Sequence, residues 1–423
     1  MEQNLVNFRW KMNNTQDSTE TLIESLHANR QRKAILIHSD FLDDEKLPEK
    51  ERIAVLNQIF NQKIRQKQLS RIISHLTPVL DRAHPPSALI YGPTGSGKTV
   101  SMIHVLSKFQ AVASRRGIGF RYVYIDLTSP KTYFGALNEA AIAIDGSNRR
   151  YRKGIPIEYM QTKIKDAIKK ETDYLCLLID EADNIQPNPD GFLTFFAKTL
   201  PRKVECRLIL ILLTNRLDWE KTLDPRILSF LKKSDIIFEP YNALDLLSIL
   251  KLRAEKALKI EKVDPGALKK IAAIASRETG DARKAVDLLA KAVQVAEDTT
   301  GYLGLDEVDL AERKLEVDKT TELIRALAEQ QRLALKACYT LLQKGRNKIT
   351  TGDSYEIYKR LCEIDCNHPL TQRRFCDMIS FLDLYGLINA RVVSRGRYGK
   401  TREIMSSLPN QVITQFLTHS ISL

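Results

Sequence analysis

The stretch Gly92-Pro93-Thr94-Gly95-Ser96-Gly97-Lys98-Thr99 decides how the rest of the chain is interpreted. It fits the pattern GxxxxGK followed by Ser or Thr, and it stands after a predicted strand and before a predicted helix, as that pattern requires. Glycines let backbone N–H groups curl around phosphates at the N-terminus of a helix. We therefore expect the whole stretch to bind ATP or ADP, with Lys98 neutralising the β- and γ-phosphate oxygens and the Thr99 hydroxyl ligating Mg²⁺. The alternative is a glycine-rich turn without a ligand.

Short apolar runs alternate with helical patterns on both sides of this motif. Continuous hydrophobicity is what a strand buried on both faces needs, and the intervening helices supply the crossovers of a parallel sheet. The sequence therefore predicts an α/β core over residues 51–240. Its parallel sheet is expected to contain the runs Ala88–Tyr91, Tyr122–Asp126, Tyr174–Asp180, Leu208–Thr214 and Ile236–Phe238.

Acidic and amide side chains follow two of these runs. Asp180 and Glu181 come at the carboxyl end of one strand, the edge at which an α/β sheet binds its ligand. We expect Asp180 to hold the magnesium shell and Glu181 to orient and polarise the attacking water. Asn215 follows the next strand along the chain and is expected to sense the γ-phosphate or to position water. The alternative is that all three are solvated turn residues.

The composition limits the class of protein. The 423 residues, about two to four domains' worth, include 65 lysines and arginines against 52 acids, a net charge of +13. This excess favours nucleic acid as a partner, the alternative being a merely basic surface. There is no apolar run of about 18 residues and no secretion signal, so we expect a cytoplasmic protein without a membrane partner. The scattered cysteines predict free thiols.

The chain turns helical after the sheet. Residues 241–300 predict a helical subdomain, and the turn residues that follow indicate a linker over 301–317. Residues 1–50 are expected to be a poorly ordered lead-in, and 411–423 a C-terminal tail. Between linker and tail, three helical patterns and two β-rich runs predict a winged helix-turn-helix over 318–410: Lys319–Gln343, Ser354–Ile364, Thr371–Tyr385, Leu387–Val393 and Thr401–Met405.

Basic side chains concentrate in this C-terminal unit, where residues 320–423 carry 15 basic and 9 acidic side chains. In the third helical pattern the apolar residues share one face, so the side chains near its N-terminus can point outward into a major groove. A glycine-hinged basic hairpin follows, suited to tracking phosphates or entering a minor groove. The alternative is a winged helix that contacts protein. The candidate DNA-binding residues are Gln372, Arg373, Arg374, Arg391, Arg395, Arg397, Tyr398, Lys400 and Arg402.

Together these motifs resemble an AAA+ ATPase of the archaeal origin-recognition and cell-division-control initiator family. The resemblance rests on a Walker A motif at 92–99, the Walker B run LLIDEAD, a sensor-one Asn215 and the helix-turn-helix segment LTQRRFCDMISFLDLYGLI. It spans about residues 60–410. It implies an α/β AAA+ P-loop core with a parallel sheet, a helical lid over 241–300 and a C-terminal winged-helix domain.

The resemblance also implies two arginine roles. Leu223-Asp224-Pro225-Arg226 resembles the box VII segment, which makes Arg226 a catalytic candidate acting in cis or from a neighbouring copy. Gly280-Asp281-Ala282-Arg283 resembles sensor two, so Arg283 is expected to link the nucleotide to the lid angle. The implied catalytic set is Lys98, Asp180, Glu181, Asn215, Arg226 and Arg283.

The chain departs from the family pattern at its start. The usual arginine–glutamate pair ahead of the P-loop is replaced by Arg65-Gln66, and the lead-in does not match the family's short basic start. The segment Ser129–Ile144 stands where these initiators carry a DNA-touching helix, but beyond Lys131, Thr132 and Tyr133 it offers little that suits DNA.

One cysteine-rich group needs a separate interpretation. Cys362, Cys366, His368 and Cys376 could in principle surround zinc, but their spacing is not that of a standard zinc knuckle. Both Cys362 and Cys376 fall in helical patterns, where a free cysteine is a small core residue, and we expect that role here.

The resemblance implies an ATP-regulated initiator of DNA replication with slow, switch-like hydrolysis. Such a protein recognises origin duplex DNA and helps to recruit the replicative helicase, acting with other initiator copies in the nucleoid. Two alternatives are an ATP-binding winged-helix transcription regulator and a clamp-loader-like AAA+ remodelling protein. The intact Glu181 argues against a regulator that does not hydrolyse ATP.

Overall fold

The computed structural model describes residues 33–43, 55, 57–60, 62, 64–129, 132–146, 150–152, 154–168, 172–185, 190–231, 234–343, 346–365, 368–394 and 400–419. The chain divides into two compact units, Met1–Val308 and Asp309–Leu423. The predicted parallel sheet, helical subdomain and winged helix-turn-helix are all present. None of the described helices is long and apolar enough to cross a membrane.

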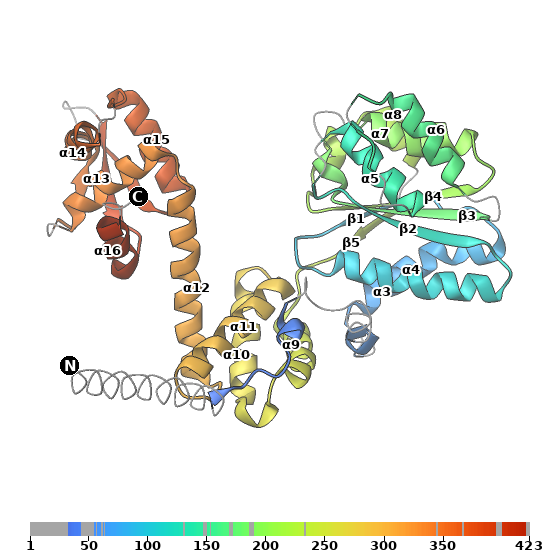
Figure 1. Cartoon of the computed structure of the whole chain (residues 1–423), viewed down its shortest axis with the longest axis horizontal. Helices are drawn as coiled ribbons and strands as arrows, with labels where there is room; N and C mark the ends of the chain where they lie inside the picture. Colours follow the sequence, from blue (N-terminus) through green and yellow to red (C-terminus); the bar gives the residue numbers. More distant parts are fainter. Residues whose placement is uncertain are drawn as a thin grey trace, which may run out of the picture. The chain divides into compact units, whose positions relative to one another are not determined.

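Five parallel strands form the sheet of the first unit, in the order β2-β3-β4-β1-β5. Helices α5 to α8 cover one face and α3 and α4 cover the other (Figure 1). Successive residues of a strand point to opposite faces, so Leu177 packs in the core under α5 while its neighbour Leu178 packs against α4. The strand bounds agree with the prediction to within two residues: β1 (Ala88–Tyr91), β2 (Phe120–Asp126), β3 (Tyr174–Asp180), β4 (Arg207–Thr214) and β5 (Ser234–Ile237).

Along the chain, helices connect successive strands of this unit, as a parallel sheet requires. The helix α3 and the 3₁₀ turn Thr77–Asp81 lie directly before β1 in the chain. The helix bounds are α3 (Gln66–Leu76), α4 (Lys98–Arg115), α5 (Tyr133–Asp145), α6 (Ile157–Ala167), α7 (Asp190–Thr194) and α8 (Pro225–Leu231).

Three helices make up the lid, α9 (Ala243–Ala257), α10 (Pro265–Glu278) and α11 (Ala282–Asp298). Each begins at a polar side chain that accepts a hydrogen bond from a free backbone N–H of the first turn. These caps are Asn242, Asp264 and Asp281. The starts of the lid helices are therefore fixed by local side-chain chemistry.

The expectation of a poorly ordered lead-in is wrong for residues 33–43. Glu297 on α11 accepts hydrogen bonds from the backbone N–H groups of Ile35 and Leu36 at 2.7 and 2.8 Å. Ile35 is fully buried, and Leu36 forms a β-bridge with Leu258. Backbone pairing of so short a segment leaves no hydrophobic period in the sequence, which is why the pattern did not reveal it. The rest of the predicted lead-in, residues 1–32 and 44–50, lies outside the described residues.

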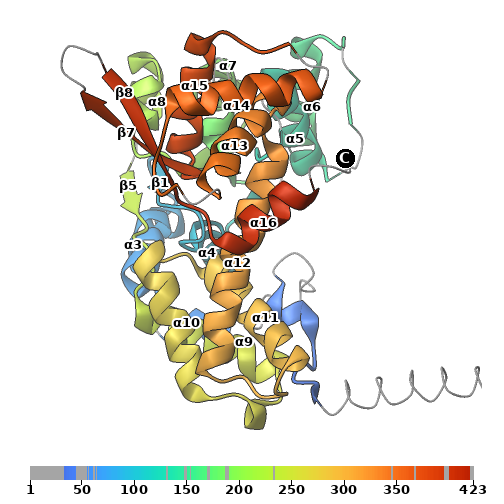
Figure 2. The same cartoon turned by 90° about the vertical axis from the view of Figure 1, so that its left-hand side faces the viewer.

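The second unit holds a three-stranded antiparallel sheet, in the order β6-β8-β7, packed on helices. Figure 2 shows the β7–β8 hairpin beside α13, α14 and α15. The elements are α13 (Glu329–Leu342), β6 (Ile349–Thr350), α14 (Thr351–Ile364), α15 (Gln372–Leu384), β7 (Ile388–Ser394), β8 (Lys400–Ser406) and α16 (Asn410–His419).

Three details of this region differ from the expectation. The predicted linker is helical from Leu305, because α12 spans Leu305–Ala326. The pattern Lys319–Gln343 is two helices, since the chain breaks at Leu327, which is buried in the core of the second unit. The tail forms most of α16, whose Val412 also packs into that core.

The core of the second unit predicts a large, local cost for truncating Phe375. This ring is fully buried, with centroids 5.3 Å from Tyr355 and 5.0 Å from Tyr358. Phe375→Ala should lower the free energy of unfolding by about 3–5 kcal/mol, because it leaves a cavity. Leu384→Ala on the same helix removes a side chain that is 81% exposed, so it should change stability by less than about 0.5 kcal/mol. Urea unfolding of the full chain measures both, and equal costs would contradict the packing.

Candidate nucleotide site and nucleic-acid interface

The P-loop joins β1 to α4. Gly95 and Gly97 adopt left-handed conformations, with φ of 70° and 83°, which a residue with a Cβ rarely adopts. Lys98 is the first residue of α4, and its Nζ donates hydrogen bonds to the carbonyl oxygens of Gly92 at 2.7 Å and Pro93 at 3.0 Å. The loop therefore bends around its own lysine at a helix N-terminus, the arrangement that suits phosphate.

Asp180 ends β3 beside the P-loop threonine. Thr99 Oγ1 donates a hydrogen bond to Asp180 Oδ2 at 2.5 Å, and the hydroxyl of Tyr124 donates to the same oxygen at 3.2 Å. A hydroxyl and a carboxylate are hard oxygen donors of the kind that Mg²⁺ takes, so the predicted pair fits this metal. Tyr124 was not among the predicted site residues; its only signal in the sequence is a phenol two residues before the end of a buried strand.

Asn215 connects the base candidate to the phosphate-binding lysine. Its Nδ2 donates to both carboxylate oxygens of Glu181, at 2.7 and 2.8 Å, and its Oδ1 accepts from Lys98 Nζ at 2.7 Å. Burial raises the pKa of Glu181 and lowers that of Lys98. The structure thus brings together Lys98, Asp180, Glu181 and Asn215, and their catalytic roles stay predictions.

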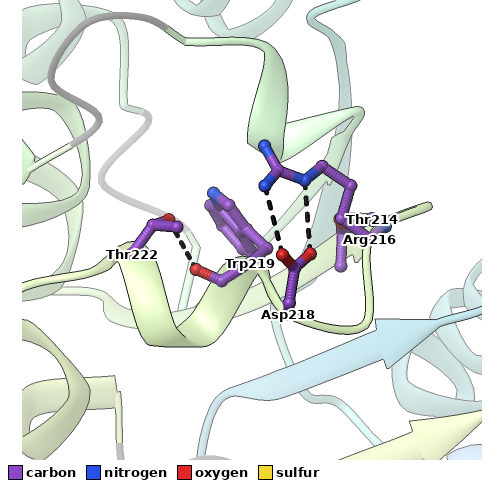
Figure 3. A network of polar contacts seen from close by, with 5 residues as sticks. All are labelled: Thr214, Arg216, Asp218, Trp219 and Thr222. Atoms are coloured by element: carbon purple, nitrogen blue, oxygen red, sulfur yellow. Dashed lines mark hydrogen bonds and ion pairs between the residues drawn. The ribbon is translucent and has the colours of Figure 1, made fainter. Parts of the chain in front are cut away.

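Polar contacts hold together the loop after β4, which contains Asn215. Figure 3 shows part of this network, from Thr214 to Thr222. The hydroxyl of Thr214 accepts from the backbone N–H of Arg216 at 3.0 Å, and Trp219 is 2% exposed, which anchors the loop in the core. Thr222 closes the turn by donating to the Trp219 carbonyl at 2.6 Å. The Arg216–Asp218 ion pair in the same loop is exposed, so it contributes little to stability.

The lid contacts the P-loop through the segment that carries Arg283. The backbone N–H of Ala282 donates to the carbonyl of Gly95 at 3.2 Å, and a Cβ on Gly95 would lie 1.7 Å from a carboxylate oxygen of Asp281. Arg283 is exposed and lies close enough to Lys98 for its charge to lower the pKa of that lysine. The lid arginine is therefore brought to the nucleotide site within one chain.

Arg226 is placed differently. It lies exposed in the first turn of α8, where its backbone N–H donates to Asp224 at 2.7 Å. Among the described residues, no hydrogen bond joins it to the other catalytic candidates. Its predicted role remains a prediction, and the exposure suits action on a neighbouring copy.

The exposed end of α15 carries the first group of DNA-binding candidates. Gln372, Arg373 and Arg374 are all exposed, because the apolar face of the helix, with Phe375 and Ile379, turns into the core. Arg391 is likewise exposed on β7. These side chains are free to meet a polyanion.

Arg402 is engaged inside the domain. Its NH1 donates to the carbonyl of Cys376 at 2.9 Å and to the Ser380 hydroxyl at 2.6 Å, which ties β8 to α15. This guanidinium therefore has a structural role in addition to the DNA contact predicted for it. Four other candidates lie outside the described residues, or have side chains that do: Arg395, Arg397, Tyr398 and Lys400.

Two weaker expectations have structural outcomes. Among the described residues, no group of three or more potential metal ligands forms, and the buried Cys362 packs in the core as expected, although Cys366 lies outside the description. In the Ser129–Ile144 segment, Thr132 caps α5 and the Tyr133 hydroxyl accepts from Gln161, so both side chains serve the fold. Lys131 lies outside the described residues.

Comparisons with known proteins agree with this arrangement. Residues 322–415 match the family described as CDC6, C terminal winged helix domain, residues 247–312 the Cdc6 AAA+ ATPase-type lid domain, and residues 81–219 an AAA domain. The chain is 33% identical over 369 residues to an ORC1-type DNA replication protein of Pyrococcus furiosus, covering 85% of this chain and 86% of the relative.

A second relative and a solved structure extend the comparison. The ORC1-type DNA replication protein of Pyrococcus horikoshii is 34% identical over 80% of this chain and 82% of its own length. The structure of the Aeropyrum pernix ORC1 protein in complex with DNA is similar with a TM-score of 0.68 and 29% identity, covering 92% of this chain and 97% of that one.

The close approach of Asp281 to Gly95 predicts an unequal cost for two glycine substitutions. Gly95→Ala and Gly117→Ala both place a Cβ at positive φ, which should lower the free energy of unfolding by about 1–2 kcal/mol. The space around Gly117 is open. Gly95→Ala must also displace the carboxylate that caps α11, so it should cost about 0.5–2 kcal/mol more. Urea unfolding provides the comparison, and equal costs would show that Asp281 does not rest on the P-loop.

Proposed function

Because the chain belongs to the family of ORC1-type DNA replication proteins, we propose that it is an ATP-regulated initiator that recognises duplex DNA at replication origins. One observation carries the proposal: Asn215 bonds both Lys98 and Glu181 beside Thr99 and Asp180, in a chain that also has a winged helix with an exposed basic helix end. ATP is the proposed ligand of the first site and origin DNA of the second.

The nucleotide site has the residues for a hydrolytic switch. Thr99 and Asp180 would hold Mg²⁺, which supplies charge neutralisation at the phosphates when bound. Lys98 binds the β- and γ-phosphate oxygens, Glu181 accepts a hydrogen bond from the attacking water and orients it, and Asn215 keeps that carboxylate in position. Because the lid segment bearing Arg283 rests on the P-loop, the exchange of ATP for ADP changes what the lid contacts.

The base role assigned to Glu181 predicts a separation of binding from hydrolysis. Glu181→Gln should lower the ATP hydrolysis rate by about 10²–10⁴-fold, the usual contribution of a general base, while Mg–ATP still binds. Burial raises the pKa of Glu181, and the protonated carboxyl cannot act as a base. As the pH is lowered, the wild-type hydrolysis rate should therefore begin to fall at a pH above the ordinary pKa of a glutamate. Single-turnover hydrolysis and equilibrium binding measure the two effects, with exposed Glu205→Gln as control. An unchanged rate would favour the alternative of a non-hydrolysing regulator.

The winged helix is the proposed DNA-binding unit. The similar Aeropyrum pernix ORC1 is described in complex with DNA. We place the N-terminal end of α15 in the major groove, with Gln372, Arg373 and Arg374 reaching bases and phosphates, and the β7–β8 hairpin along the backbone. The same proposal has the protein act with further copies in the cytoplasm at the nucleoid, where it helps to recruit the replicative helicase.

The exposed end of α15 predicts a measurable change in salt dependence. Arg373→Ala/Arg374→Ala should weaken binding to duplex DNA at low salt. It should also reduce the slope of log K against log salt by about 0.9 for each phosphate contact that is lost. Lys251→Ala/Lys269→Ala removes the same charge from exposed positions on the lid and should leave the slope nearly unchanged. Equal changes in both variants would argue against α15 as the contact.

The biological role is tested by mapping the sites that the protein binds across the genome. An initiator should concentrate at the points where replication starts, and a transcription regulator at promoters. Enrichment at promoters alone would overturn the assignment to replication while leaving the ATP and DNA sites intact.

A further inference from the structure

Arg65 lies at the position where the chain departs from its family pattern, immediately before α3. It adopts a left-handed conformation with φ of 61°, which is unfavourable for a residue with a long side chain. It is nevertheless 8% exposed, an unusual burial for arginine. Two costs at one residue indicate that its side chain makes compensating interactions.

The guanidinium joins the P-loop to the strand end that leads to the lid. Its NH2 donates to the carbonyl of Ser96 at 2.8 Å and to the carbonyl of Glu239 at 2.5 Å. The Cζ atom of the guanidinium lies 3.9 Å from the ring centroid of Tyr241 and 5.5 Å from that of Phe238, within cation–π range. Among the described residues its partners are carbonyl oxygens and aromatic faces rather than a carboxylate, so the missing acid at Gln66 is not replaced.

Tyr241 carries the link on to the lid. Its backbone N–H donates to the carbonyl of Gly280 at 3.0 Å, and a Cβ on Gly280 would lie 2.7 Å from the Tyr241 carbonyl oxygen. The next residues of the lid return to the P-loop, where Ala282 N–H donates to Gly95. These contacts form a closed series, called the circuit below. It runs from the P-loop to Arg65, from Arg65 to the strand end, from the strand end to the lid segment, and from the lid segment back to the P-loop.

We infer that Arg65 is a positioning residue that fixes the connection between the sheet and the lid to the P-loop. Binding of nucleotide at the P-loop then changes the position of the lid. The inference rests on the proposed ATP control and deepens it. Removing the acceptor of a buried, charged donor costs more free energy than removing that of an exposed donor. Lysine cannot reproduce the contacts of a planar guanidinium that both donates hydrogen bonds and lies against an aromatic ring.

The test is hydrogen exchange of the full chain without nucleotide, because two amides of the circuit report directly on it. In Arg65→Gln, the Tyr241 and Ala282 amides should exchange about tenfold faster than in the wild type, and ATP affinity should fall by about tenfold or more, on the scale of a lost charged hydrogen bond. The exchange rates and the ATP affinity of Arg65→Lys should lie between those of the wild type and those of Arg65→Gln.

Arg82→Gln is the matched control, because Arg82 shares the left-handed backbone, with φ of 57°, but is exposed. It should leave both amides unchanged. Arg65→Gln amides exchanging at the wild-type rate would overturn the inference. Faster exchange spread equally over β3 and β4 would also overturn it, since it would show general destabilisation.

One further variant and the absence of nucleotide keep the result interpretable. Tyr241→Leu removes the aromatic ring while Arg65 remains, and it should also accelerate exchange at Ala282; if it does not, the circuit does not pass through Tyr241. Exchange is measured without nucleotide, so it does not depend on ATP binding. Failure of the wild type to bind ATP would therefore overturn the proposed function, while the exchange rates would still decide the role of Arg65.

Discussion

Parallel pairing of β3, β4 and β1 determines where every group of the nucleotide site can stand. Ile179 lies opposite Leu212, and Tyr91 lies opposite Thr214, so the three strands end at one edge of the sheet. The P-loop, the acids after β3 and the asparagine after β4 leave that edge together. A shift of one residue in this pairing would turn the side chains to the other face and separate the groups.

Burial gives this edge its chemical character. Lys98 is 6% exposed and Asp180 is 8% exposed, and an isolated charge at such depth would be costly. The cost is partly offset because the lysine has two carbonyl acceptors and the Asn215 amide, with both acids near enough to favour its charge; burial still outweighs them and lowers the pKa of Lys98. Each of these groups is thus held by a neighbour that also belongs to the site.

The sequence predicted the parts of the molecule that are encoded by local pattern. The strands of the sheet, the P-loop and the groups at 180, 181 and 215 follow from hydrophobic runs and a motif with a known context. The missed contacts join positions far apart in the chain: Tyr124 with Asp180, Arg65 with Glu239, and Arg402 with α15. Side chains of these types at such positions carry no periodic signal, and only the folded backbone shows what each one meets.

The attachment of residues 33–43 to the lid has a practical consequence for work with truncated proteins. A fragment that began at residue 51, the predicted start of the α/β core, would remove the N–H donors of Glu297 and expose the apolar lid surface beneath Ile35 and Leu42. In such a fragment water would take the place of the lost N–H donors, but the exposed apolar surface would remain. Aggregation of the fragment would then reflect where the truncation was made rather than a property of the whole chain.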